Sequence, residues 1–299
     1  MSTQNLGTEP FERVALIGIG LIGSSLARVL RRDSPDTVIV ACARRAETLD
    51  AVRRLELADE TTDDPALAVA GADLVVIATP LSAYAEIAAR IAPALRDGAI
   101  VTDVGSVKGA AVQALQPLLP SRVHFVPGHP VAGTEHSGPE AGFAELFRDR
   151  WCILTPPPGT APEAVAKIAA LWEKAGMRVA TMTAAHHDKV LAVTSHLPHL
   201  IAYTIVGTAT DLGHDLESEV VAYSAGGFRD FTRIAASDPV MWRDIFLANR
   251  EAVLELLQRF SEDLTALQRA IRRGEGDTLH QYFARTRAIR RSIIEANQA

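Results

Sequence analysis

Short apolar runs alternate with helical patterns through roughly the first 180 residues of the chain. Runs typical of buried parallel strands lie at residues 14–17, 37–43, 73–80, 99–104 and 122–127. Helical spacing of apolar residues lies between them, at 46–57, 83–95 and 108–118. Strand-like runs at 151–155 and 177–182, with a helical pattern at 161–175, are expected to extend the same sheet. The alternation predicts an α/β fold with a Rossmann-like, doubly wound parallel sheet.

The pattern changes at about residue 183, after which only helices are predicted. Helical stretches cover 184–210, 240–272 and 277–297, and a glycine-containing break lies at 224–227. Apolar positions of the 240–272 stretch follow three- and four-residue steps, which is typical of an amphipathic helix with a wide apolar face. That face packs either against a partner subunit or inside one chain. We therefore expect a sheet domain at 1–183 and an all-helical domain at 184–299.

A glycine-rich turn joins the first predicted strand to the first helix, with G-x-G-x-x-G spacing. The first glycine permits a tight turn, the second lets the backbone approach a pyrophosphate, and the third lets the helix pack on its strand. A tight turn without a ligand is the alternative, but the flanking strand and helix favour dinucleotide binding. Together with the end of the third strand, the expected cofactor-binding residues are Gly18, Gly20, Leu21, Ile22, Gly23, Thr79 and Pro80.

The residues after the second strand bear on the choice of nicotinamide cofactor. An enzyme that selects NAD usually has Asp or Glu there, to accept a hydrogen bond from the ribose 2′-OH. This chain has Ala43 followed by Arg44 and Arg45. Two guanidinium groups would bind the 2′-phosphate of NADP, although two ordinary surface arginines are the alternative. NADP is therefore favoured, and NAD is the second possibility.

Composition excludes several classes of partner. The 299 residues are 48% hydrophobic and 22% charged, as in a globular protein, and the net charge of -6 argues against a nucleic-acid partner. No uninterrupted apolar run reaches the roughly 20 residues of a membrane span, and the N-terminus does not resemble a signal peptide. Cys42 and Cys152 lie in apolar strand-like runs, as buried free thiols of a cytoplasmic protein would. No metal-ligand spacing is recognisable, so we expect no metal.

Polar residues stand near the ends of the fourth and fifth predicted strands, at the sheet edge where open α/β sheets bind ligands. Ser106 follows the fourth strand, either as a helix N-cap or as a site residue. His129 follows the fifth strand beside a proline. A histidine with a pKa near neutrality is suited to accept the proton of an alcohol that is being oxidised. A lone histidine in a structural role is the alternative.

The predicted helix at 184–210 carries a polar cluster in an apolar stretch. Ser195 and His196 precede His199 by four and three residues, so each lies close to His199 on the helix surface. Pro198 removes a backbone hydrogen bond and should kink the helix. The cluster is either a wall of a ligand site or a satisfied polar core. Downstream of a glycine pair, two arginines suggest bidentate recognition of a carboxylate, namely Arg229 and Arg233.

These motifs resemble the prephenate/arogenate dehydrogenase family of tyrosine biosynthesis over almost the whole chain. The motifs that carry the resemblance lie at 18–23, 103–108, 128–135, 195–199, 227–235 and 237–242. The resemblance implies oxidative decarboxylation of prephenate and/or L-arogenate to 4-hydroxyphenylpyruvate or L-tyrosine, with hydride transfer to NAD(P)+. It also implies a dinucleotide-binding domain followed by a helical substrate and dimerisation domain, and hence a homodimer.

The resemblance implies roles for single residues as well. His129 would take the proton of the ring hydroxyl, and Ser106 would orient that histidine and the cofactor. Arg233 would hold the ring carboxylate. The side-chain end of the substrate and the walls of the site would be formed by His199, Ser195, Arg229, Glu135 and Trp242.

Substrate preference receives two opposing signals. The positive charge of Arg229 favours the keto acid prephenate, whereas the Arg44-Arg45 pair resembles family members that use NADP and arogenate. We therefore expect a broad cyclohexadienyl specificity. We also expect neither a fused mutase nor an appended regulatory domain, since the sequence ends with the helical domain.

Two other functions fit part of the pattern. A β-hydroxyacid or imine-type dehydrogenase would share the glycine loop and use a catalytic lysine on the first long helix, where Lys189 lies. A protein that senses NADP without turnover would keep the three glycines. The first alternative leaves the motifs at 128–135 and 195–199 without a purpose, and the second has no use for His129 or Arg233.

Overall fold

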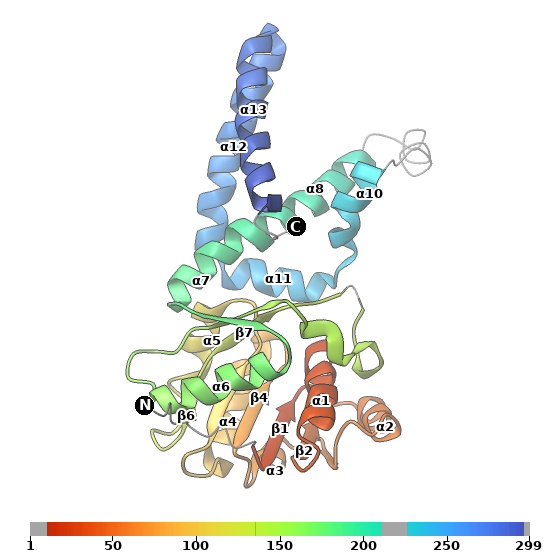
Figure 1. Ribbon diagram of the computed structural model, residues 1–299, viewed down its shortest axis with the longest axis vertical. Coiled ribbons are helices and arrows are strands. Elements are labelled where there is room, and N and C mark those ends of the chain that lie inside the picture. Colours follow the sequence, from red (N-terminus) through yellow and green to blue (C-terminus); the bar gives the residue numbers. More distant parts are fainter. Residues whose placement is uncertain (1–10, 135, 211–225, 296–299) are drawn as a thin grey trace. The chain divides into compact units, whose positions relative to one another are not determined.

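The computed structural model describes residues 11–134, 136–210 and 226–295, and its main sheet and helices are drawn in Figure 1. The chain divides into two compact units, Met1–Arg250 and Glu251–Ala299. The first unit contains both sheets and the helices that carry the candidate site. The second is a pair of helices.

A six-stranded parallel sheet forms the centre of the first unit, in the order β3-β2-β1-β4-β5-β6. The predicted doubly wound sheet is therefore confirmed, and the strand order reverses between β1 and β4, where such sheets bind ligands. The edge strand β3 was not predicted, because it has only three residues and none is apolar. The strands are β1 (Arg13–Ile17), β2 (Val38–Cys42), β3 (Glu60–Thr62), β4 (Leu74–Ile77), β5 (Ile100–Asp103) and β6 (His124–Phe125).

A second, three-stranded sheet is built from β7 (Gly128–Val131), β8 (Trp151–Leu154) and β9 (Arg178–Thr181). Strand β7 pairs antiparallel with β8, and β8 pairs parallel with β9. The expectation that the last two strands extend the main sheet is therefore wrong. The predicted fifth strand is shortened to two residues, since Pro127 lacks the N–H needed to continue the ladder. His129 consequently lies on a strand of the second sheet and not in a loop.

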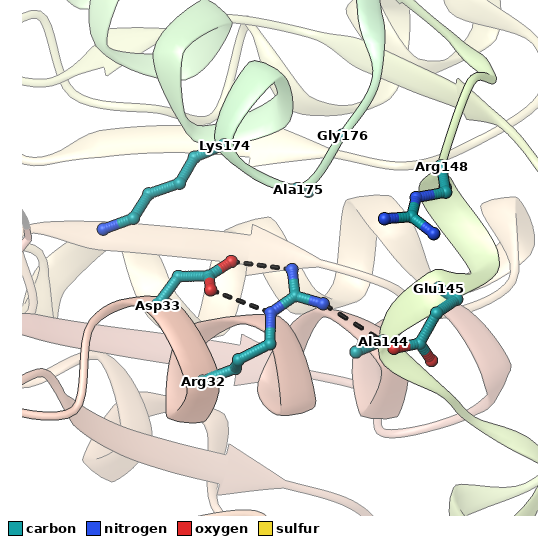
Figure 2. A pocket seen from close by; sticks show the side chains of 8 residues that line it. All are labelled: Arg32, Asp33, Ala144, Glu145, Arg148, Lys174, Ala175 and Gly176. Atoms are coloured by element: carbon teal, nitrogen blue, oxygen red, sulfur yellow. Dashed lines mark hydrogen bonds and ion pairs between the residues drawn. The ribbon is translucent and has the colours of Figure 1, made fainter.

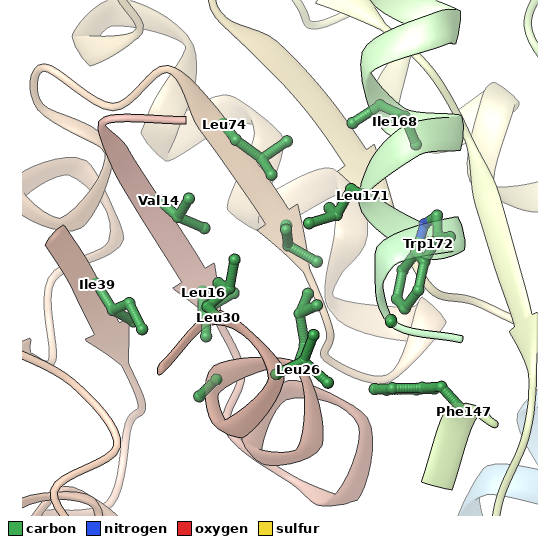
Figure 3. Packing of buried hydrophobic residues seen from close by; sticks show 14 of the residues in the cluster. Val14, Leu16, Leu26, Leu30, Ile39, Leu74, Phe147, Ile168, Leu171 and Trp172 are labelled. Carbon is green, nitrogen blue, oxygen red and sulfur yellow. The ribbon is translucent and has the colours of Figure 1, made fainter. Parts of the chain in front are cut away.

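Both faces of the main sheet are buried by helices. On one face, α1 (Leu21–Asp33) and α6 (Pro162–Lys174) cover the strands, as Figure 3 shows for the packing around Trp172 and Phe147. On the other face, Tyr84, Ile91 and Leu115 pack on the alternate strand residues. Burial on both sides explains why the strands read as continuous apolar runs. The remaining helices are α2 (Ala46–Arg54), α3 (Pro65–Val69), η1 (Leu81–Ala83), α4 (Tyr84–Ile91), η2 (Ala92–Ala94) and α5 (Lys108–Leu115). Two 3-10 turns, η3 (Pro139–Ala141) and η4 (Ala144–Phe147), lie between β7 and β8.

The helical part of the first unit begins with one long helical run. It consists of α7 (Ala184–Leu191), a π-helical turn η5 (Ala192–His196) and α8 (Leu197–Thr210). The π turn ends just before Leu197, and Pro198 is the second residue of α8. Both features are typical of helix bends, and the predicted kink stays a prediction. The run is followed by α10 (Gly226–Thr232), η6 (Arg233–Ala236) and α11 (Pro239–Ala248). In Figure 1, α11 lies between α8 and the sheets.

The stretch Ala184–Ala209 is long and apolar enough to cross a membrane by length and composition alone. Its most apolar 18-residue window has a mean hydropathy of 1.4. The run still contains the polar residues Ser195, His196 and His199, and both histidine rings contact Trp242. One such helix is weak evidence for a membrane span, since core helices of globular domains pass the same test.

The predicted continuous helix at 240–272 is wrong at one residue. Asn249, with φ -106° and ψ 30°, ends α11 and separates it from α12 (Arg250–Arg273). A left-handed Gly274 then leads to α13 (Gly276–Glu295). The two helices α12 and α13 leave several large apolar side chains exposed, namely Leu254, Leu264, Ile271, Phe283 and Ile289.

Candidate active site

The glycine turn before α1 has the geometry that a dinucleotide requires. Gly18 has a φ of +94°, and a Cβ there would lie 2.5 Å from the carbonyl oxygen of Ala78. A Cβ on Gly23 would lie 2.3 Å from the carbonyl oxygen of Gly18, so both positions exclude larger residues. Around Gly20, by contrast, a Cβ would meet nothing within 4 Å. Gly20 is also the N-cap of α1 and makes no side-chain cap, so open space lies at the positive end of the helix.

The residues expected to flank this turn lie beside it. Leu21 and Ile22 begin α1 and pack partly buried on the core, which orients the first turn of the helix. Thr79 and Pro80 follow β4, and a Cβ on Gly18 would lie 2.9 Å from Cγ2 of Thr79. The turn and the end of β4 therefore approach each other at the reversal of strand order.

Arg44 and Arg45 directly follow β2 and are exposed. Within the described part of the chain, neither guanidinium makes a hydrogen bond or an ion pair. No carboxylate occupies the position just after the strand, where NAD-selective folds usually place one.

A fully buried ion pair joins the end of β5 to the start of α5. Nζ of Lys108 bonds to Oδ2 of Asp103 and, at 2.6 Å, to the carbonyl oxygen of Gly128. The hydroxyl of Tyr84 and the N–H of Gly105 also donate to Oδ2 of Asp103. Burial lowers the pKa of Lys108, and the Asp103 carboxylate partly offsets that effect. Because Gly128 immediately precedes His129, the bond from Lys108 fixes the backbone of β7 next to this candidate base.

His129 is the first member of a chain of three hydrogen-bonded side chains. Its Nδ1 lies 2.8 Å from Nε2 of His187, and Nδ1 of His187 lies 2.8 Å from Oδ1 of Asp188. The carboxylate of Asp188 also accepts from the backbone N–H groups of Lys108 and Gly109. Burial would raise the pKa of Asp188, but its hydrogen bonds outweigh burial and lower it. Asp188 therefore remains ionised near neutral pH.

The hydrogen bonds determine where the protons of this chain reside. The ionised Asp188 can only accept, so His187 carries its proton on Nδ1. Burial lowers the pKa of His187 and holds that of His129 well below its usual value, so both rings are neutral near pH 7. The lone pair on Nε2 of His187 then accepts the Nδ1 proton of His129. The free lone pair of His129 is consequently on Nε2, as a proton acceptor requires.

Ser106 lies between β5 and α5 but has neither of the hydrogen bonds expected for it. The N-cap of α5 is Val107, and no side chain of the capping residue closes the helix. Asp188 caps the first turn instead, from α7. In the described residues no hydrogen bond joins Ser106 to His129, whose Nδ1 is occupied by His187. Ser106 is partly exposed beside these groups, and its role toward the cofactor stays a prediction.

A second polar cluster lies around the π turn. Nδ2 of Asn249 donates to the carbonyl oxygen of Asp188 and lies 3.1 Å from Nδ1 of His196. Burial lowers the pKa of His196 to about 4. The ring of His196 meets Trp242 edge-on. Asn249, the residue at which α11 ends, thus connects Asp188 to His196 on the π turn.

His199 also contacts Trp242, on the face of the indole. Its ring stacks on the indole with centroids 3.6 Å apart, and its Nδ1 lies 2.8 Å from the carbonyl oxygen of Ser195. Trp242 is 5% exposed and packs against Val107 and Ile245. The indole therefore lies between the histidines of the helical run and the start of α5.

Two other predicted site residues, Arg233 and Arg229, are exposed. Arg233 is exposed on η6, and its charge acts on His199. The side chain of Arg229 is 76% exposed and pairs with Asp230 at 3.7 Å. Glu135 lies outside the described residues.

Six residues that contribute to this arrangement were not predicted as site residues. They are His187, Asp188, Lys108, Asn249, Asp103 and Tyr84. The signal for the first two was present, because a His-His-Asp triplet opens an otherwise apolar helical stretch. A lysine inside the 103–108 motif and an asparagine within a helical pattern carry no comparable signal.

A surface pocket of about 460 Å³ lies away from these residues, at the C-terminal ends of α1 and α6. Figure 2 shows Arg32 held between Asp33 and Glu145 across its floor. Because none of the predicted site residues lines the pocket, we assign it no part in the chemistry.

Comparison with known proteins identifies the family. Residues 26–181 match the nucleotide-binding domain of prephenate dehydrogenase, and residues 183–285 match its dimerization domain. A cyclohexadienyl dehydrogenase of Zymomonas mobilis is 45% identical over 95% of this chain and 96% of its own length.

Solved structures agree. A prephenate dehydrogenase from A. aeolicus, in complex with hydroxyphenyl propionate and NAD+, has a TM-score of 0.88 and 36% identity, over 96% of this chain and 100% of that one. An arogenate dehydrogenase from Synechocystis has a TM-score of 0.79 and 29% identity, over 94% and 99%. The chain therefore belongs to the prephenate dehydrogenase family, as its motifs predicted.

Proposed function

We propose that this chain catalyses the oxidative decarboxylation of both prephenate and L-arogenate, with NADP+ as the favoured hydride acceptor and NAD+ as the second. The single observation that carries the proposal is the neutral, buried His129, whose Nε2 lone pair is left free by the bonds to His187 and Asp188. Family membership supports the reaction type, and the relatives named above include cyclohexadienyl and arogenate dehydrogenases.

The residues of the glycine turn fit a nicotinamide dinucleotide. The open space at Gly20 and the uncapped start of α1 would hold the pyrophosphate, between Leu21, Ile22 and the Thr79-Pro80 segment. The chemistry that the nicotinamide supplies when bound is acceptance of a hydride from the ring carbon that carries the hydroxyl. Exposed Arg44 and Arg45 support NADP, because a 2′-phosphate would find two guanidinium groups and no carboxylate.

His129 takes the hydroxyl proton in this scheme. As Nε2 becomes protonated, the imidazolium can share its Nδ1 proton with His187, and the ionised Asp188 stabilises the positive charge. Loss of the hydride and the proton turns the ring alcohol into a dienone. The ring carboxylate then leaves as CO₂, and its bonding electron pair makes the ring aromatic as a phenolate, to which the proton held by His129 returns. Aromatisation makes the step irreversible. Holding the ring carboxylate is assigned to Arg233, and lining the side-chain end to His199, Ser195 and Arg229.

We further propose that the functional division follows the predicted domains, 1–183 and 184–299, and that a homodimer forms through the helical domain. The description of residues 183–285 as a dimerization domain supports this, as do the exposed apolar residues of α12 and α13. The two free, buried cysteines are consistent with a cytoplasmic protein.

One set of assays tests the proposed function. Initial rates are measured with prephenate and arogenate, each with NADP+ and NAD+, for the wild type and for His129→Asn. We expect turnover of both substrates by the wild type, and a loss in the variant of about 10²- to 10⁴-fold with cofactor binding retained. No turnover of either substrate by folded, cofactor-binding wild type would refute the proposal.

A further inference from the structure

The ring of His199 is fixed in one orientation by two neighbours. Its Nδ1 is 2.8 Å from the backbone carbonyl oxygen of Ser195, and its face stacks on the buried indole of Trp242 at 3.6 Å. A carbonyl oxygen only accepts hydrogen bonds, so Nδ1 carries a proton whatever the charge of the ring. Nε2 is therefore the position at which the ring gains or loses its second proton.

The two charge states of His199 consequently offer opposite hydrogen bonds at the same place. The neutral ring presents a lone pair on Nε2 and can only accept there. The imidazolium presents an N–H and a positive charge and can only donate. Because the ring cannot turn without breaking the bond to Ser195 and the stack on Trp242, a ligand meets one polarity or the other.

The groups around His199 favour the neutral state at neutral pH without holding it there at all pH values. Burial lowers the pKa of His199, the Ser195 carbonyl raises it, and the charge of Arg233 on η6 lowers it again. His196, on the same helical run, is itself neutral over most of the range. Helix α11 contacts the ring through the indole of Trp242. Helix α10 contributes the exposed Arg229 and Asp230, which pair with each other.

The two candidate substrates differ in the same property. Arogenate carries an ammonium group, a donor with a positive charge, where prephenate carries a keto oxygen, which only accepts. Both retain the side-chain carboxylate and the ring. We propose that His199 sets the substrate preference through its charge state: the neutral ring selects the amino acid and the protonated ring selects the keto acid. This inference rests on the proposed function, which assigns His199 to the side-chain end.

The ratio of kcat/KM for arogenate to kcat/KM for prephenate, measured between pH 5.5 and 8.5, tests the inference. The base His129 and the cofactor act on both substrates alike, so their titrations cancel in the ratio. We expect the ratio to rise with pH by about tenfold or more, as expected for a charge-assisted hydrogen bond gained by one substrate and lost by the other. In His199→Asn, whose side chain does not titrate, the ratio should be independent of pH.

A binding measurement provides a second test that does not depend on turnover. L-tyrosine and 4-hydroxyphenylpyruvate carry the same amino and keto side chains as the substrates. Their dissociation constants from the cofactor-bound enzyme should diverge in the same direction over the same pH range. His199→Gln serves as the variant if His199→Asn does not fold.

The outcomes are distinguishable. Turnover of both substrates at a ratio that does not change with pH overturns the inference and leaves the proposed function intact. A pH-dependent ratio that persists in His199→Asn also overturns it. Turnover of neither substrate overturns the proposed function, and this inference with it.

Discussion

At the scale of single residues, the two ring nitrogens of His129 have different roles. Nδ1 is bound to His187 and Nε2 is free, and this difference follows from one ionised carboxylate two side chains away. The charge of Asp188 fixes the tautomer of His187, which fixes that of His129. An amide side chain in place of Asp188 could donate as well as accept, and would leave both tautomers open.

His187 should therefore matter to the rate through the orientation of His129. His187→Leu leaves the Nδ1 proton of His129 buried without an acceptor, which costs about 1–3 kcal/mol of folding stability. We expect kcat to fall about 10- to 100-fold, within the range of a general base that is misplaced but present. In His187→Gln the amide oxygen can still accept that proton, so most of the rate should return. Equal rates for both variants and the wild type would contradict the role.

Arg44 and Arg45 define a second prediction at this scale. Replacing both by Ala should raise the KM for NADP+ at least about tenfold, since each charged contact contributes about 1.5–3 kcal/mol at most, and should change the KM for NAD+ little. Arg53→Ala, an exposed arginine on α2, is the matched control. Equal changes for both cofactors would make the pair ordinary surface charge.

At the scale of elements, β5, α5 and β7 meet at one buried ion pair. Lys108→Met leaves the Asp103 carboxyl without its cation and the Gly128 carbonyl without its donor. We expect about 3–5 kcal/mol of lost unfolding free energy, measured by urea denaturation at fixed pH. Adding Asp103→Asn should recover part of that loss, because the uncompensated charge is then removed. A double variant less stable than Lys108→Met would contradict this account.

The elements also show what the amino-acid sequence could and could not predict. The apolar runs of β1, β2, β4 and β5 are buried on both faces, so their pattern is strong and each was predicted. Strand β3 is too short and polar to be recognised. The departure of β7 into a second sheet depends on long-range pairing with β8, which no local pattern encodes. The end of α11 at Asn249 depends on side-chain bonds to Asp188 and His196.

The same reasoning applies to the site. His129, Ser195 and His199 were predicted because they are polar residues in motifs at strand ends or within an apolar helix, and their roles toward a substrate stay predictions. Ser106 was expected to orient His129, because the two residues follow neighbouring predicted strands at the same edge of the sheet. The structure supplies His187 instead, 58 residues away from His129. Folding brings α7 to the start of α5, and sequence spacing does not reveal such a contact.

At the scale of the whole molecule, buried histidines should control the acid limit of stability. Burial lowers the pKa values of His129, His187 and His196, the last to about 4, below the unfolded value near 6.5. The unfolded chain therefore binds more protons, so stability is fully present above about pH 6.5 and is lost as pH falls.

The loss can be measured by urea unfolding between pH 7 and 4.5, above the range in which carboxylates with lowered pKa values are protonated. His196 alone should account for about 2–3 kcal/mol by pH 4.5. His196→Asn should remove that share of the pH dependence, whereas His280→Asn, at an exposed position, should not. A free energy of unfolding that is constant over this range would contradict the prediction.

The pair of helices α12 and α13 carries the prediction on assembly. Leu264 is 54% exposed on the apolar face of α12, and a charge there should weaken a dimer. We expect Leu264→Glu to shift the mass measured by light scattering toward the monomer, and Ala266→Glu, on the opposite side of the helix, to leave it unchanged. A dimer that survives Leu264→Glu would place the interface elsewhere.

The carboxylate of Asp188 closes the first turn of one helix, aligns two imidazoles and belongs to a residue whose carbonyl anchors Asn249. The stability of the fold and the rate of the reaction therefore both depend on Asp188. A selection for thermal stability and a selection for turnover rate would both act on Asp188. A substitution there that changes one of these properties would also change the other.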